Sequence, residues 1–211
     1  MASTGTRPLM AENPTSPSKI NRQSFFDFVR KEFFNGKLSQ GQVDGMSAIL
    51  DQWEKKGFTD KRWLAYMLAT VYHETAKTMS PIEEFGRGQK YAYGQKVTME
   101  RKPYQSPDKL YYGRGFVQIT WYDNYQNMGK ILNVNLLEKP ELALEIDVAT
   151  QILFEGMTKS TSSRGDFTGK CVENFFNDTT EDWVGARKII NGKDKAEKIA
   201  EYAQRFMKAF A

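Results

Sequence analysis

Histidine and cysteine are almost absent from this sequence, which contains one residue of each. A catalytic zinc site normally uses two or three imidazoles or several thiolates, so His73 and Cys171 cannot supply one. A lone cysteine also excludes an internal disulfide and is typical of a protein made in a reducing cytoplasm. We therefore expect no metal and no cofactor, and we expect Cys171 to be a small buried hydrophobic residue.

Long apolar runs are missing too. No run of eighteen apolar residues occurs, so we expect no membrane-spanning helix. The first nineteen residues lack the charged start and the apolar stretch of a secretory signal. They contain three of the seven prolines and are otherwise mostly small or polar. Residues 1–19 therefore read as a flexible leader, followed by a single catalytic domain over residues 20–211.

The charge is moderately basic. A net charge of +4 suits attraction to an anionic surface such as a bacterial wall or a nucleic acid. However, no arginine-rich arm, zinc-finger spacing or RNA-binding motif with interleaved aromatic and basic residues is present. We therefore expect no nucleic-acid partner.

Helix signals dominate the chain from residue 24 onwards. Ser24, Ser39 and Asp194 each precede an acidic or amide residue by three positions, the spacing of a capping box at a helix start. Apolar residues then recur at helical intervals. The predicted helical segments are residues 24–35, 39–57, 59–78, 126–132, 147–157 and 194–210. Residues 83–112, rich in glycine, proline and aromatic residues, indicate short strands and loops.

The third predicted helix carries a glutamate near its end. Glu74 follows Met67 by seven positions and Val71 by three, so at about 100° per residue it lies on the core-facing side of the helix. Cleavage of a glycosidic bond needs a protonated carboxyl group that donates to the leaving oxygen, and apolar surroundings favour that protonated form. Glu74 is thus a candidate general acid. The structural alternative is a buried ion pair with an arginine.

Three short motifs stand out in order along the chain. They are His73-Glu74-Thr75 followed by Glu83-Glu84, the run from Tyr111 to Thr120 with its Gly-Arg-Gly turn, and the string from Ala186 to Gly192 that ends in Ile-Asn-Gly. In this combination the sequence resembles glycoside hydrolase family 19, which includes plant and bacterial chitinases and many phage endolysins, over roughly residues 39–210. The resemblance implies an α+β, mainly α-helical, lysozyme-like fold with two lobes, a central cleft and a small strand and loop region.

The resemblance also implies a pair of catalytic carboxylates. Glu74 corresponds to the family's general acid. The second carboxylate corresponds best to Glu83, with Glu84 as its immediate rival and Glu100 as a more distant one. Neighbouring residues on an extended segment point to opposite sides, so we expect only one of the first two to face the cleft. The family's inverting mechanism needs the two carboxyl groups roughly 6.5–9.5 Å apart, with a water between them.

Other site residues follow from the same motifs. The resemblance implies that Thr120 holds the attacking water, that Gln118 binds an N-acetyl sugar and that Asn191 contacts the sugar across the cleft from the acid. Asn191 is also a strong turn residue, because it precedes a glycine. Among the aromatic residues we select Tyr112 for stacking on a sugar. Glu84, if it is not the base, is assigned to substrate binding.

The expected function is that of a monomeric endolysin that cleaves peptidoglycan between N-acetylmuramic acid and N-acetylglucosamine. It would be made in a host cytoplasm without a signal peptide, reach the wall after membrane permeabilisation, and not insert into the membrane. The lack of a disulfide set and the short insertion before the Gly-Arg-Gly turn depart from the plant chitinase pattern. The alternatives are a chitinase that uses the same residues and a non-catalytic wall-binding module. The intact pair of candidate carboxylates disfavours the module.

Overall fold

Helices dominate the computed structural model, which describes residues 19–158 and 167–211. The described residues form α1 (Arg22–Phe33), α2 (Gln40–Lys56), α3 (Lys61–Glu74), α4 (Tyr122–Leu132), α5 (Ile146–Met157) and α6 (Ala196–Met207). Short 3-10 helices lie at η1 (Ala92–Gly94), η2 (Pro140–Leu144), η3 (Val172–Asn174), η4 (Gly185–Ile189) and η5 (Lys208–Phe210). The prediction of a mainly helical fold is confirmed. The predicted leader, except for Lys19, falls outside the described residues.

A small sheet accompanies the helices. β1 (Ile82–Glu83) pairs antiparallel with β2 (Arg114–Gly115), and Glu83 lies opposite Arg114 in the register. These strands lie at the two ends of the glycine-rich and aromatic segment in which short strands and loops were predicted. The sheet therefore brings the Glu83-Glu84 pair next to the Gly-Arg-Gly turn.

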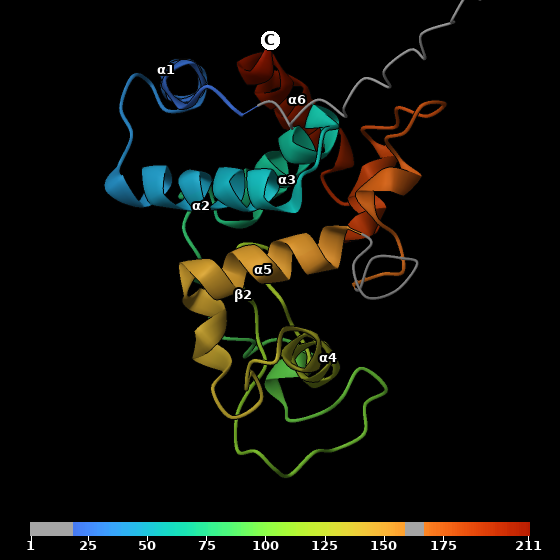
Figure 1. The fold of residues 1–211 in the computed structure, drawn as a ribbon. Coiled ribbons are helices and arrows are strands. Elements are labelled where there is room, and N and C mark those ends of the chain that lie inside the picture. The colour runs from blue at the N-terminus through green and yellow to red at the C-terminus, as the bar shows by residue number, and fades with distance from the viewer. Residues whose placement is uncertain (1–18, 159–166) are drawn as a thin grey trace, which may run out of the picture.

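The elements are arranged in two lobes (Figure 1). One lobe contains α1, α2, α3 and α6, and the other contains α4 and the loop that follows β1. α5 runs alongside α2 and packs against it. α3 packs mainly on α6 and is buried at every position from Leu64 to Tyr72. Glu74 therefore sits at the end of a largely buried helix, which fixes its position.

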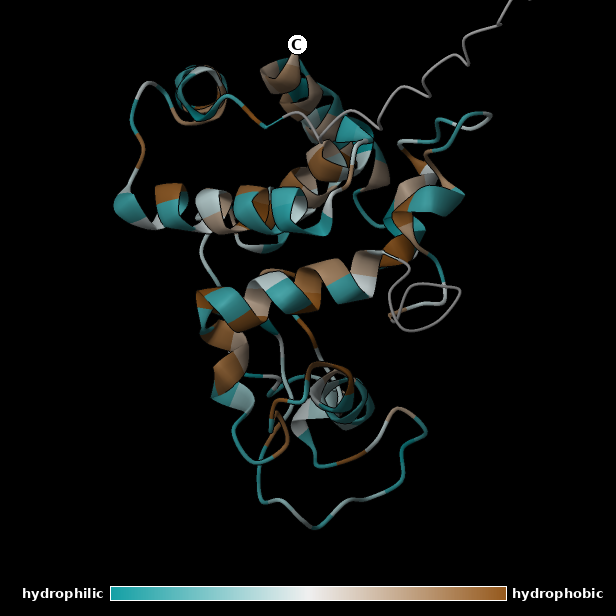
Figure 2. Ribbon diagram, in the orientation of Figure 1, coloured by the Kyte–Doolittle hydropathy of each residue, from teal (hydrophilic) through white to brown (hydrophobic). Residues whose placement is uncertain are grey.

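Local sequence signals explain most helix ends. Ser39 and Gln42 form the predicted capping box, with the Gln42 N–H donating to Ser39 Oγ at 3.2 Å. α2 ends at Gly57, whose φ of 68° is unfavourable for residues with a Cβ. Apolar and polar residues alternate along α2 and α5, as expected for helices with one buried face (Figure 2). Cys171 is buried as predicted.

Several predicted helix boundaries are wrong. α4, predicted to begin near residue 126, begins at Tyr122. α1 begins earlier than Ser24, because the side chain of Asn21 caps it by accepting from the Ser24 N–H at 3.0 Å. α3 ends at Glu74 and not at residue 78, because residues 76, 77 and 79 have positive φ. α6 has no Asp194 capping box, because Lys195 occupies the N-cap position and no side chain caps the helix. No helix among the described residues is long and apolar enough to span a membrane.

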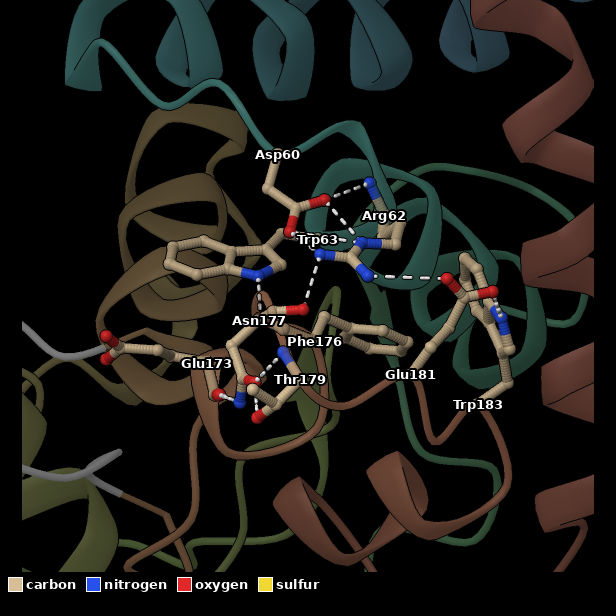
Figure 3. Close-up of polar contacts among 9 residues, drawn as sticks. All are labelled: Asp60, Arg62, Trp63, Glu173, Phe176, Asn177, Thr179, Glu181 and Trp183. Atoms are coloured by element: carbon tan, nitrogen blue, oxygen red, sulfur yellow. Dashed lines mark hydrogen bonds and ion pairs between the residues drawn. The ribbon is translucent and has the colours of Figure 1, made fainter.

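A polar network holds the chain before η4 against the start of α3 (Figure 3). The Arg62 guanidinium donates to Asp60 Oδ2 at 2.6 Å, to the Asn177 carbonyl at 3.1 Å and to Glu181 Oε2 at 3.3 Å. Its partners thus come from α3's own N-cap and from a loop more than a hundred residues away in sequence. Glu74 lies at the other end of α3, so α3 connects this polar network to the site described next.

Candidate active site

Glu74 faces a polar cleft at the C-terminal end of α3. Its side chain is 17% exposed, and it lines a cavity of about 470 Å³. The cavity is also lined by residues of the segment after the Gly-Arg-Gly turn and by Asn191. A partly buried carboxyl group thus opens on a space large enough for a sugar unit.

Arg187 forms an ion pair with this carboxylate. Its Nη1 lies 2.6 Å from Glu74 Oε1, and its side chain is only 3% exposed. The Arg187 Nε–H donates to the Asp194 carbonyl at 3.0 Å, which fixes the guanidinium. Glu74 was predicted to lie on an apolar face, with a buried ion pair to an arginine as the structural alternative, and that ion pair is present. Among the described residues Oε2 of Glu74 accepts no hydrogen bond, so one oxygen stays available for chemistry.

Thr120, Gln118 and Asn191 line the same cavity as Glu74. The Gln118 amide donates to the Ile82 carbonyl at 2.9 Å and to the Gly115 carbonyl at 3.1 Å. Its carbonyl oxygen is left as an acceptor. Gln118 has a φ of 52°, a costly conformation that the surrounding contacts must hold. The structure thus brings together four of the seven predicted site residues.

The Gly-Arg-Gly turn needs its glycines for space. A Cβ on Gly113 would lie 2.8 Å from the Gln118 side chain, and one on Gly115 would lie 2.7 Å from the Ala143 carbonyl. Gly115 also has a φ of 84°. These close approaches place Gln118 against β1 and so determine the wall of the cavity.

Glu83 lies beside the cavity and not on its lining. Its Oε1 accepts from the Tyr112 hydroxyl at 2.8 Å and lies 3.5 Å from Arg114 Nε, while Oε2 lies 3.2 Å from Arg87 Nη2. The Tyr112 hydrogen bond, followed by the charges of Arg87 and Arg114, lowers the pKa of Glu83 despite an opposing desolvation. The carboxylate is therefore kept ionised, which a general base requires.

Glu84 is held by structural hydrogen bonds on both oxygens. Tyr93 donates its hydroxyl to Oε1 at 2.8 Å, and the Gly113 N–H donates to Oε2 at 3.0 Å. Glu84 is likewise absent from the described lining of the cavity. The third candidate, Glu100, is exposed and pairs with Lys102 at 2.6 Å. Glu83 lies on β1 next to Ile82, whose carbonyl accepts from Gln118, and its side chain is 31% exposed.

Tyr112 is not placed for the predicted sugar stacking. Its side chain is buried, with an exposure of 6%, and the Arg114 guanidinium lies 3.6 Å from its ring centroid. One ring face is thus covered, and the hydroxyl is used by Glu83. Tyr112 instead donates its hydroxyl to Glu83.

Sequence reasoning missed several residues at or beside the cavity. Arg187 stands four positions before Asn191 in a motif that was noted only for its asparagine. Asn124 and Tyr93 also line the cavity, and Tyr93 meets the edge of Trp121 with ring centroids 5.5 Å apart. Trp121 has a φ of 75°, rare for a bulky residue. Asn124 and Tyr93 lie outside the three motifs, so a motif match does not report them.

A mainly helical two-lobed fold, with a glutamate at a helix end facing hydroxyl and amide side chains, is a glycoside hydrolase scaffold of the lysozyme-like kind. The chain belongs to glycoside hydrolase family 19, whose model, described as chitinase class I, matches residues 52–180. This confirms the resemblance drawn from the motifs.

Individual relatives agree with the family. An endochitinase of Arabidopsis thaliana is 32% identical over 65% of this chain and 47% of its own length. Endochitinase CH5B of Phaseolus vulgaris is 34% identical over 61% of this chain and 44% of its own. The matches thus span less than half of these curated relatives.

Solved structures share the fold. Chitinase C from Streptomyces griseus HUT6037 aligns over 95% of both chains with a TM-score of 0.54 and 22% identity. A bacterial family 19 chitinase aligns over 92% of this chain and 96% of its own with a TM-score of 0.57 and 21% identity. The predicted lysozyme-like fold class is therefore confirmed.

Proposed function

We propose that this protein hydrolyses β-1,4 bonds of peptidoglycan, between N-acetylmuramic acid and N-acetylglucosamine. The observation that carries the proposal is the single cavity lined by Glu74, Thr120, Gln118 and Asn191. It joins a carboxyl group, a hydroxyl and two amides, which suits the acetamido and hydroxyl groups of an amino sugar.

In the proposed mechanism Glu74 donates a proton from its free oxygen to the leaving glycosidic oxygen. Arg187 holds the other oxygen and orients the carboxyl group towards the cavity. Glu83, kept ionised by Tyr112, removes a proton from a water that Thr120 binds, and this water attacks from the opposite face of the sugar. The product then has the inverted configuration. Gln118 and Asn191 bind the sugar on either side.

The natural setting is part of the proposal. We place synthesis in a host cytoplasm, which a lone buried cysteine suits, and action on the wall after the membrane is permeabilised. Chitin is the second candidate substrate, because the relatives reported above are named endochitinases. The two polymers share the amino-sugar backbone that this cavity would bind.

Release of reducing ends from purified peptidoglycan and from chitin oligosaccharides tests the proposal. The Glu74→Gln variant serves as the control, since it keeps the shape of the side chain and removes the proton. We expect cleavage of peptidoglycan by the wild type and a loss of about 10²–10⁴ in rate for the variant. Cleavage of chitin alone would assign the second candidate. An active Glu74→Gln variant would remove Glu74 from its proposed role.

A further inference from the structure

A second hollow lies directly behind the wall of the catalytic cavity. It measures about 640 Å³, and four exposed lysines line it: Lys188, Lys193, Lys195 and Lys198. The carboxylates of Asp182 and Glu197 are the acidic groups on its described lining. Four ammonium groups against two carboxylates leave a local excess of two positive charges.

These lysines are not neutralised by the rest of the described protein. None of them forms an ion pair among residues 19–158 and 167–211. Asp182 is already engaged, because its carboxylate accepts the Gly185 N–H at 2.7 Å. The hollow is also lined by the first turn of α6, an uncapped twelve-residue helix whose positive end adds to the same potential. Its potential therefore favours an anionic ligand.

The two cavities share one short segment of chain. Ile190 and Asn191 line the catalytic cavity, and the next two residues, Gly192 and Lys193, line the hollow. A polymer bound in the cleft would thus have its side branches within reach of the lysines. This favours an anionic group carried by the substrate itself over an unrelated anionic polymer.

We infer that the lysine-lined hollow binds the peptide carboxylates of peptidoglycan while the glycan strand occupies the cleft. The inference rests on the proposed function for its choice of polymer. Chitin carries no carboxylates, so the hollow would act as a specificity site that separates the two candidate substrates.

Binding is tested by co-sedimentation with insoluble peptidoglycan from which accessory phosphate polymers have been stripped. The Glu74→Gln background prevents hydrolysis. The test variant combines Lys188→Gln, Lys193→Gln and Lys195→Gln. The matched control combines Lys31→Gln, Lys130→Gln and Lys139→Gln, three exposed lysines outside the hollow, and has the same net charge.

We expect the test variant to bind about tenfold more weakly than the control at low salt, from three partly screened charge pairs. The protein with all its lysines intact should bind amidated peptidoglycan about tenfold more weakly than unmodified peptidoglycan. This second experiment changes the polymer and leaves the hollow unaltered. Equal binding by the two triple variants, or loss only on walls that retain phosphate polymers, would overturn the inference.

The two proposals fail separately. If the wild type releases no reducing ends from peptidoglycan, the proposed function fails whatever the sedimentation shows. If hydrolysis occurs but the lysine substitutions and the amidation leave binding unchanged, only the specificity site is lost. The test variant and its control should bind a neutral chitin oligosaccharide equally well.

Discussion

Nη1 of Arg187 lies 2.6 Å from Oε1 of Glu74, although the two residues are 113 positions apart in sequence. Glu74 ends α3, and Arg187 lies on η4, whose preceding loop is held to the start of α3 by Arg62. The ion pair therefore holds one carboxylate oxygen of Glu74, the candidate acid. Its cation comes from η4, and the loop before η4 is in turn held to the start of α3.

Removing Arg187 should destabilise the protein strongly. Arg187→Met leaves the partly buried Glu74 carboxylate without its cation, so we expect a loss of about 3–5 kcal/mol in the free energy of unfolding. Arg187→Lys keeps the charge and should lose less. In a double-mutant cycle measured by urea unfolding, Glu74→Gln should relieve part of the Arg187→Met cost. Strictly additive losses would contradict a direct pair.

The second carboxylate can be identified by substitution and stereochemistry. We expect Glu83→Gln to lose about 10²–10⁴ in kcat on peptidoglycan, because an amide cannot accept the proton of the attacking water. Glu84→Gln should affect activity mildly and lower the melting temperature, because one of its two acceptor oxygens is replaced by a donor.

Proton NMR of freshly cleaved oligosaccharide, before mutarotation, tests the same mechanism independently. Attack by water from the opposite face should give the inverted α-anomer. A retained β product would exclude a base-activated water. An inactive Glu84 variant beside an active Glu83 variant would keep inversion and exchange the two roles.

Tyr112 should set the acid limit of activity. Its hydrogen bond is the main cause of the lowered pKa of Glu83, so Tyr112→Phe should raise that pKa towards the ordinary value for glutamate. The acid limb of the pH–kcat profile should move to higher pH, with little change near neutrality. An unmoved limb would show that Glu83 is not the titrating base.

The same variant makes a prediction for stability. A lowered pKa contributes stability that is present above the ordinary pKa of the carboxyl group and is lost as the pH falls through the folded-state value. Thermal unfolding of Tyr112→Phe should therefore depend less on pH in the acidic range than that of the wild type. Equal pH dependence would contradict a role for this hydrogen bond.

Arg62 should stabilise the fold without taking part in chemistry. Arg62→Met removes three hydrogen-bonded contacts of a side chain that is 23% exposed, so we expect a loss of about 1–3 kcal/mol. Arg30→Met, at an ion pair whose side chains are both 46% exposed, is the control and should change stability by less than about 0.5 kcal/mol. Similar losses for both variants would show that the Arg62 network adds nothing beyond a surface pair.

Much of the local structure could be predicted from the sequence. The capping box at Ser39 and the stop at Gly57 depend on residues a few positions apart, and both were predicted. At the start of α1 the prediction failed because a nearby residue competes for the cap position. Asn21 caps α1 in place of Ser24, because its side chain accepts from the Ser24 N–H and so starts the helix about one turn earlier.

Membership of the family was likewise determined by the sequence, because short motifs in a fixed order identify it. The choice of Glu74 as the acid comes from the same motifs and stays a prediction. The tertiary structure alone decided the surroundings of each carboxylate. Glu83 and Glu84 are neighbours with the same chemistry, yet one meets Tyr112 and two arginines and the other is bonded to Tyr93 and Gly113. Those partners come from turns that only the folded chain brings together, and local propensity contains no information about contacts at such sequence separations.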